Sequence, residues 1–325
     1  MLTLTIVIFL AILIIGHELG HFLTAKKFGV RVDEFGFGLP PRIASRKAGE
    51  TRYSLNLLPI GGFVKIHGQH REENKPLEEP HRAFFNQPAH RRAIILISGV
   101  AANFIIGWLA LSFVFSMGAP SKLFVVEVLP GSVAEEVGFK PNEIIRGFST
   151  PEEFTNFIQA HREETVTING KTIIVPEEGI IGVRINAFSV PKENPLQSLL
   201  KGFDAAIGIA VGVVKAASQI IVSAFIGDTS GLKQLTGPVG IFNIIKEAEG
   251  LVFLIYLLGA ISINLAVFNL LPVPALDGGH LLFLGIEKII RRPIPQRVEV
   301  LANAAGFTLL LLLILLVTFR DIMKL

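Results

Sequence analysis

The sequence predicts an α-helical membrane protein with four transmembrane helices, a membrane-associated β-hairpin and a small α+β domain inserted after the second span. Three observations predict this class. Hydrophobic residues make up 50% of the 325 positions. They gather into four long apolar segments, and the connections between these segments differ sharply in composition. The net charge of +3 is too small to indicate a nucleic-acid-binding protein.

The four expected spans each reach the roughly 17–25 residues that cross a bilayer. They are Leu2–Ala25, Ala93–Met117, Leu251–Leu271 and Leu301–Phe319. Lysine and arginine gather near span ends in two connections, one running from Lys26 to Arg92 and the other from Lys288 to Arg297. Because short cytoplasmic loops are enriched in these residues, we expect both connections to be cytoplasmic and the segment 118–250 to be extracytoplasmic.

The first span contains the ionisable residues His17, Glu18 and His21 in an otherwise apolar helix. Such groups are costly inside a bilayer and indicate a functional site. Two histidines four residues apart lie on one helix face, one turn from each other, so both imidazoles can bind one Zn²⁺ with the glutamate beside it as general base. The chain has no cysteine, so any further ligand is a histidine or a carboxylate.

A third ligand is expected at the end of the third span. Pro272 and Pro274 break the helix there, and Asp277 follows at the cytoplasmic level expected for His17 and His21. Two alternatives stay open from the residues alone. Asp277 could instead cap the next helix, and His280 is a competing ligand.

The first cytoplasmic connection is unusually apolar and is punctuated by glycine and proline. Alternation in Thr51–Leu57 predicts a β-hairpin covering about 34–66. Non-helical backbone at membrane depth is tolerated where it is buried in protein or lines a wet cavity. We therefore expect the hairpin to dip back toward the metal site, with an ordinary cytoplasmic hairpin as the alternative.

A charged stretch with short β-like runs lies between the second and third spans. A helix over Pro151–Arg162 is expected to begin at the capping residue Thr150. The expected strands are Leu123–Val128, Ile144–Phe148, Thr165–Ile168 and Thr172–Val175. The later segment Phe203–Ile226 is apolar but holds charged residues, and an odd number of extra crossings would misplace the basic loop that follows. We expect an interfacial helix there, with a fifth span as the alternative.

These observations divide the chain into three parts. Residues 1–118 hold the first two spans and the hairpin, and residues 119–187 form the small domain. Residues 188–325 hold an interfacial region at about 198–250 and the last two spans.

Two distant segments carry a resemblance to a known family. HELGH in the first span and NLLPVPALDGG from Asn269 onward resemble the site-2 protease family of intramembrane zinc metalloproteases, in particular the regulator-of-sigma-E branch with a PDZ domain. Further stretches match along the chain, namely Phe84–Pro88, Gly36–Gly38, Gly61–Lys65 and Leu235–Gly240. The chain departs from better-known members in having one short PDZ-like segment and in having Gly99-Val100 where Gly-Pro is common.

The resemblance implies a set of roles for these residues. His17, His21 and Asp277 would bind Zn²⁺, Glu18 would act as the base, and Asn269 would assist at the substrate. The hairpin would pair with unwound substrate as an added strand, through Tyr53, Ser54, Leu55, Asn56, Leu57 and Leu58. Interhelical hydrogen bonding is the alternative role of Asn269.

The implied function is hydrolysis of peptide bonds within or near the transmembrane segment of single-span proteins, such as anti-sigma factors or signal-peptide remnants. The enzyme would lie in the bacterial inner membrane, with its active site toward the cytoplasm and the PDZ-like domain outside. A peptide or chain terminus would bind between Leu123–Val128 and Pro151–Arg162, with the loop Pro120–Leu123 as a carboxylate nest, or the domain would act as a size filter.

Two other function classes fit less well. A non-hydrolytic zinc-binding scaffold with a peptide-binding PDZ domain would be expected to have lost Glu18 or Asp277, and both are present. A metal transporter would need polar residues along its spans, and the second and fourth spans have few beyond Asn103 and Asn303.

Overall fold

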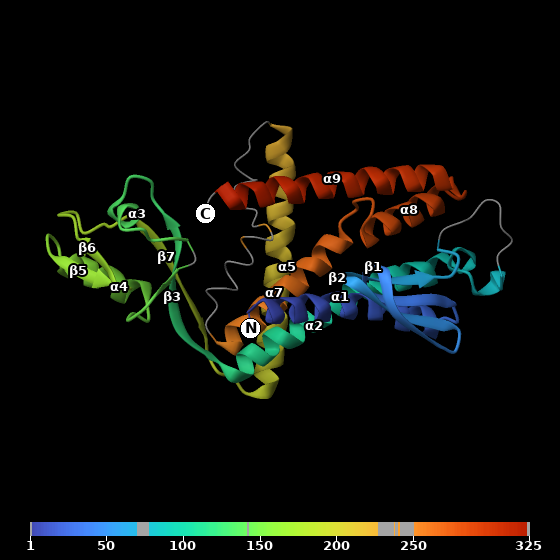
Figure 1. Cartoon of the computed structure of the whole chain (residues 1–325), viewed down its shortest axis with the longest axis horizontal. Helices are drawn as coiled ribbons and strands as arrows, with labels where there is room; N and C mark the ends of the chain where they lie inside the picture. The colour runs from blue at the N-terminus through green and yellow to red at the C-terminus, as the bar shows by residue number, and fades with distance from the viewer. Residues whose placement is uncertain are drawn as a thin grey trace. The chain divides into compact units, whose positions relative to one another are not determined.

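The computed structural model describes residues 2–69, 78–141, 143–226, 237, 240 and 250–323 (Figure 1). Within these residues, four helices contain a segment long and apolar enough to cross a membrane, which confirms the expected spans by length and composition. They are α1 (Leu2–Lys27), α2 (Ala89–Met117), α7 (Leu251–Leu270) and α9 (Gln296–Met323). The matched stretch Leu235–Gly240 lies outside the described residues except for Gly237 and Gly240.

The chain divides into two compact units. The first unit comprises Met1–Ala110, Phe203–Val239 and Leu258–Leu325, and the second comprises Leu111–Gly202 and Gly240–Leu257. Three helices contribute residues to both units, namely α2, α5 (Pro195–Phe225) and α7. The boundary between the units therefore falls within helices and not at their ends.

In the first unit, small residues bring the helices close together. A Cβ on Gly20 of α1 would lie 2.3 Å from the carbonyl oxygen of Ser98 in α2. Likewise, a Cβ on Gly107 of α2 would lie 2.9 Å from the carbonyl oxygen of Gly259 in α7. Small residues at such contacts are typical of helices packed inside a membrane.

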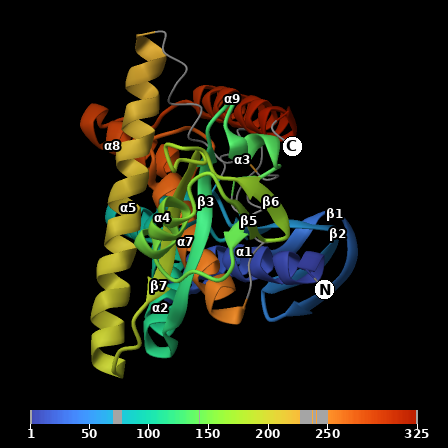
Figure 2. The ribbon, with the colours of Figure 1, turned by 90° about the vertical axis from the view of Figure 1, so that its left-hand side faces the viewer.

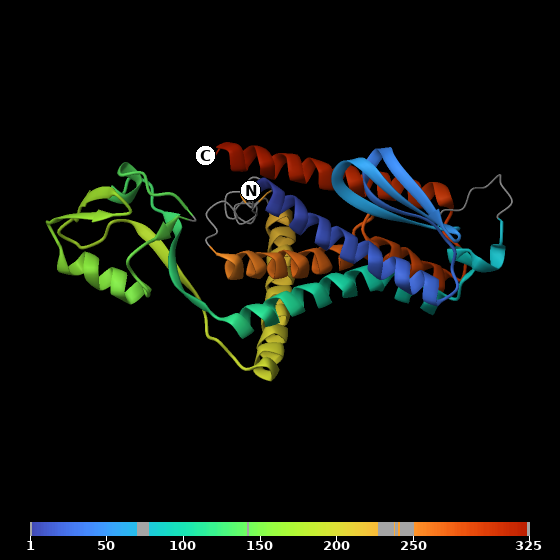
Figure 3. The same ribbon diagram turned by 60° about the horizontal axis from the view of Figure 1, so that its bottom comes forward.

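The connection between α1 and α2 forms the expected β-hairpin, with β1 at Val32–Ala48 and β2 at Thr51–Ile66. Figure 3 shows it beside α1, and α1 contacts both strands. Two short 3-10 helices, η1 (Pro80–Arg82) and η2 (Phe84–Asn86), precede α2.

The register of this hairpin corrects one expectation. Tyr53 pairs with both Phe35 and Arg46, and the next two residues, Ser54 and Leu55, also have partners on both sides. Residues 53–55 of the expected substrate strand Tyr53–Leu58 are therefore inside the sheet and are not a free edge, whereas Asn56 and Leu58 have one register partner each. The long strands fold back on themselves, so residues 34–37 pair with both 52–55 and 62–65, a long-range pairing that local alternation does not reveal.

Helix α5 is one continuous helix of 31 residues. It is not among the four candidate spans of the described chain, and its Phe203 ring packs against those of Phe104 and Trp108, with centroids 6.0 and 5.7 Å away. Its interfacial placement stays a prediction.

The second unit holds a three-stranded antiparallel sheet of order β4–β3–β7, in which β3 and β7 run side by side (Figure 2), and a separate hairpin, β5–β6. The strands are β3 (Ala119–Val128), β4 (Ile144–Ile145), β5 (Thr165–Ile168), β6 (Lys171–Ile174) and β7 (Val183–Val190). The two helices are α3 (Val133–Glu136) and α4 (Pro151–Ala160). As expected, α4 begins after Thr150, whose hydroxyl accepts a hydrogen bond of 3.1 Å from the backbone N–H of Glu153.

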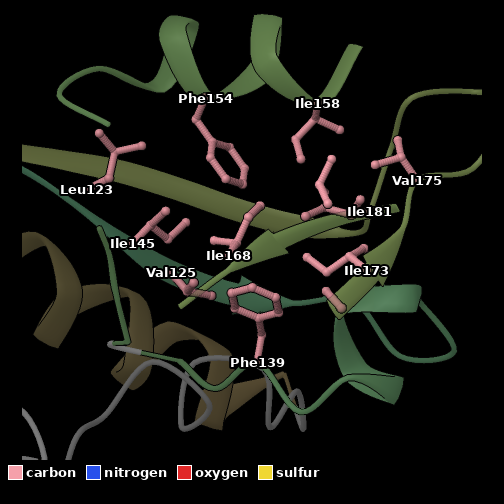
Figure 4. Packing of buried hydrophobic residues seen from close by; sticks show 12 residues of the cluster. Leu123, Val125, Phe139, Ile145, Phe154, Ile158, Ile168, Ile173, Val175 and Ile181 are labelled. Atoms are coloured by element: carbon pink, nitrogen blue, oxygen red, sulfur yellow. The ribbon is translucent and has the colours of Figure 1, made fainter. Parts of the chain in front are cut away.

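Side chains from these strands and helices enclose one apolar core (Figure 4). Phe154 and Ile158 of α4 point into it, opposite Leu123 and Val125 of β3. The second unit thus has a hydrophobic core of its own.

Strand β7 was not expected, and it changes the interpretation of Pro120–Leu123. We expected this segment to be a loop, but it belongs to β3 because Ala119 and Lys122 pair with β7. Leu123 is paired on both sides, with Ile145 and with Ala187, and so is Phe124. A peptide strand cannot add to β3 at these two residues.

Candidate metal centre

Three side chains from α1 and α8 (Asp277–Ile290) meet in the first unit. The Nε2 atoms of His17 and His21 lie 3.2 and 3.3 Å from Oδ2 of Asp277. The two Nε2 atoms lie 3.2 Å from each other. Within the described part of the chain, this is the one group of three or more potential ligands close enough to share a metal ion. The structure thus brings together the three residues that the sequence analysis selected.

The donor atoms fit a zinc ion. Nitrogen and oxygen ligands about 2.0–2.1 Å from tetrahedral zinc lie about 3.3 Å from one another. The three observed separations are within about 0.2 Å of that edge length. Because Nδ1 of His21 lies 2.8 Å from the carbonyl oxygen of Ile95 and donates to it, the Nε2 of neutral His21 presents a lone pair to the carboxylate. Converging lone pairs repel unless a cation lies between them.

The loop between α7 and α8 brings Asp277 to this point. A Cβ on Gly278 would lie 2.1 Å from the carbonyl oxygen of Leu271, and a Cβ on Gly279 would lie 2.4 Å from that of Val273. These glycines let α8 begin directly against the loop. No side chain caps the start of α8 by a hydrogen bond, so the capping alternative for Asp277 finds no support.

His280, the competing ligand, faces elsewhere. Its Nδ1 lies 3.3 Å from Oε1 of Glu299, and it lines a different small cavity.

A cavity of about 260 Å³ opens beside the three donor atoms. Glu18 and Asn269 both line it, so the expected base and the expected substrate-assisting residue face the same space as the metal site. Strand β2 passes close to Glu18, since a Cβ on Gly62 would lie 3.4 Å from its Cγ. The hairpin residues that line the cavity are Gly62, Phe63, Val64 and Ile66. The expected substrate strand Tyr53–Leu58 contributes no residue to the lining.

Comparison with known proteins decides the family. Residues 5–313 match the family model described as peptidase family M50. The chain belongs to this family. It is 31% identical to a provisionally named zinc metalloprotease of Clostridium perfringens, over 95% of both chains. It is 28% identical to the zinc metalloprotease RasP of Geobacillus kaustophilus, over 96% of this chain and 95% of that one. RasP of Shouchella clausii is 27% identical over 99% of both chains.

The M50 membership and these relatives establish a zinc metalloprotease with zinc as its cofactor. The four apolar helices agree with a multi-pass membrane protein.

Asn103 of α2 also belongs to the site of this M50 peptidase, although the sequence analysis did not assign it there. It is 1% exposed, and its amide nitrogen lies 3.4 Å from Nδ1 of His17. Its Oδ1 has no hydrogen-bond partner within the described residues. Turning the amide by 180° lets Oδ1 accept from His17 Nδ1–H, which orients Nε2 toward the metal position. The available signal was a lone asparagine in an apolar span.

A second unassigned residue is Gly99, where α2 passes against the imidazoles. A Cβ at Gly99 would lie 2.3 Å from Nε2 of His21 and 2.8 Å from Cε1 of His17. Glycine is therefore required for α2 to approach the two rings this closely. Val100, the departure from the family pattern, leaves this contact unchanged.

Proposed function

We propose that this M50 peptidase is an intramembrane protease of the site-2 type, with His17, His21 and Asp277 as zinc ligands and Glu18 as general base. The observation that carries the proposal is the position of the donor atoms. Two of them belong to a helix apolar enough to span a membrane, and the third comes after the short loop 271–276 that follows another such helix. A water-accessible peptidase site at this place acts on chains that are themselves in the membrane.

The residues around the cavity then have distinct tasks. Zinc held by His17, His21 and Asp277 would supply a Lewis acid that polarises the substrate carbonyl and lowers the pKa of the attacking water. Glu18, which lines the same cavity, takes the proton from that water and delivers it to the leaving amine. Asn269 donates its amide N–H to the oxygen on which negative charge develops. Asn103 keeps the His17 ring in place.

We further propose that substrate binds as a strand along Gly62–Ile66, which replaces the earlier expectation for Tyr53–Leu58. Gly62, Phe63 and Val64 each have one register partner, on the Val32–Phe37 side. The segment also lines the cavity beside the donor atoms. A helix unwound at its cleavage site has free amides, and an open strand edge offers them hydrogen-bond partners.

We place the metal site toward the cytoplasm of a bacterial inner membrane, and residues 119–187 of the second unit outside it, on the basic residues that flank the spans. Within that unit, residues 119–187 are proposed as a PDZ-like domain. Because β3 is paired on both sides at Leu123 and Phe124, we favour a size filter over peptide capture by that strand. The substrates proposed are single-span proteins such as anti-sigma factors or signal-peptide remnants.

The test uses purified full-length enzyme and single-span substrates in liposomes, with cleavage sites located by mass spectrometry. Wild type is expected to cut within or next to the apolar segment. The Glu18→Gln variant is expected to retain zinc and lose at least a hundredfold in turnover, since general-base catalysis contributes about 10²–10⁴-fold. Cuts confined to soluble regions would contradict the intramembrane assignment. Zinc binding without any cleavage by wild type would favour the scaffold alternative.

A further inference from the structure

The last helix, α9, contacts the loop that precedes Asp277. The backbone N–H of Ala275 donates to Oδ1 of Asn303, at 3.0 Å. Three residues further along α9, a Cβ on Gly306 would lie 2.2 Å from the carbonyl oxygen of Pro274. Gly306 is buried. α9 therefore supports the loop through one hydrogen bond and one close backbone approach.

The loop has an unfavourable conformation at the residue that α9 holds. Ala275 has a φ of +78°, in the left-handed region that residues with a Cβ rarely adopt. Such a conformation persists where surrounding interactions enforce it. The hydrogen bond from the Ala275 N–H to Asn303 is an interaction of this kind.

The held residue is close to the proposed third ligand. Only Leu276, in an extended conformation with φ −107° and ψ 164°, separates Ala275 from Asp277. A rotation about the backbone of Ala275 therefore moves the start of α8 and the Asp277 carboxylate together. The separations of about 3.2 Å between Asp277 Oδ2 and the imidazoles leave little room for such movement.

We propose that Asn303 is a positioning residue for zinc binding. By fixing the Ala275 N–H, it holds the loop in its left-handed turn and keeps Asp277 within reach of His17 and His21. The inference rests on the proposed role of Asp277 as ligand. It means that α9 supports the metal site indirectly, through the loop, although it supplies no ligand.

The test measures zinc release from full-length, zinc-loaded enzyme in detergent to an excess of chelator. Loss of partners that orient metal ligands costs about 10–100-fold in metal affinity, so Asn303→Ala is expected to release zinc at least tenfold faster than wild type. The matched control is Thr308→Ala on the same helix, where the hydroxyl donates to the carbonyl oxygen of Ala304 in its own helix. The control is expected to release zinc at the wild-type rate.

A second variant separates positioning from general damage to the helix. Glycine adopts a positive φ without steric cost, so Ala275→Gly in the Asn303→Ala background should slow zinc release on the order of threefold. A merely destabilised helix would gain nothing from a more flexible loop. If Asn303→Ala does not fold, Asn303→Ser replaces it and is judged by the same two comparisons.

The outcomes distinguish this inference from the proposed function. If Asp277→Ala releases zinc no faster than wild type, the ligand assignment fails. If Asp277→Ala loses zinc while Asn303→Ala releases it at the wild-type rate, the ligand assignment stands and the positioning role of Asn303 is overturned. Absence of rescue by Ala275→Gly also overturns the positioning role.

Discussion

Replacing Gly99 by alanine tests whether the approach of α2 to the two histidines sets the geometry of the zinc site. The new Cβ would lie 2.3 Å from Nε2 of His21, the donor atom itself. The closest tolerable contact is about 3.4 Å, so either α2 or the ring must move by about 1 Å. The ring cannot retreat freely, since its Nδ1 is bonded at 2.8 Å to the carbonyl of Ile95 on α2.

The expected magnitude follows from this clash. Overpacking a well-packed site costs about 1–3 kcal/mol. At about 1.4 kcal/mol per factor of ten, zinc affinity should fall about fivefold to 150-fold in Gly99→Ala. Competition titration with a chelator of known zinc affinity measures this change directly, without reference to catalysis.

The matched control is Gly285→Ala on α8, where a Cβ meets nothing within 4 Å. This variant should bind zinc as wild type does. Wild-type zinc affinity in a folded Gly99→Ala enzyme would refute the argument that the backbone of α2 limits the position of the imidazoles.

Three further predictions concern other parts of the chain. Asn103→Ala should weaken zinc binding at least tenfold, measured by the same titration, and unchanged affinity would remove Asn103 from the support of His17. Val64→Pro removes a backbone N–H from the proposed substrate strand Gly62–Ile66 and should lower turnover at least tenfold with zinc content retained, whereas Leu57→Ala should stay active. A fully active proline variant would contradict the assignment of this strand to substrate. Burial acts to raise the pKa of Glu143, but hydrogen bonds from Lys171 and Asn169 outweigh it and hold that pKa below its ordinary value. The ionised Glu143 therefore stabilises the folded state above the ordinary glutamate pKa, and this stability is lost as pH falls through the lowered pKa of Glu143. In Lys171→Met, hydrogen-exchange protection in the second unit should decline less steeply on the acid side than in wild type. An unchanged pH dependence would argue against the Lys171–Glu143 pair.

The proposed metal ligands could be predicted from the sequence because local spacing and a short list of possible ligand types both point to them. Helical periodicity places His17 and His21 on one face, and the absence of cysteine leaves few candidates for the third position. The prolines and glycines around Asp277 marked the turn that brings it to the site. The structure agrees with each of these steps.

Features that depend on long-range pairing were missed. The alternation of Thr51–Leu57 predicts a strand. Whether that strand lies at the edge of the sheet depends on its pairing with the distant segment 34–37, and no local pattern encodes this pairing. Strand β7 did carry a usable signal, since Val183, Ile185 and Ala187 alternate with polar residues. The direction in which Asn103 faces could not be read from one asparagine in an apolar helix.

The proposed zinc ligands come from opposite ends of the chain, two from α1 and one from α8. During synthesis, a chain that has emerged only as far as α5 has both imidazoles but lacks the carboxylate. Two ligands do not close a zinc site, so the peptidase stays inactive until the last quarter of the chain, which carries Asp277, has been inserted. A protease that forms its centre this late cannot cut neighbouring membrane proteins, or its own unfinished copies, while it is being made.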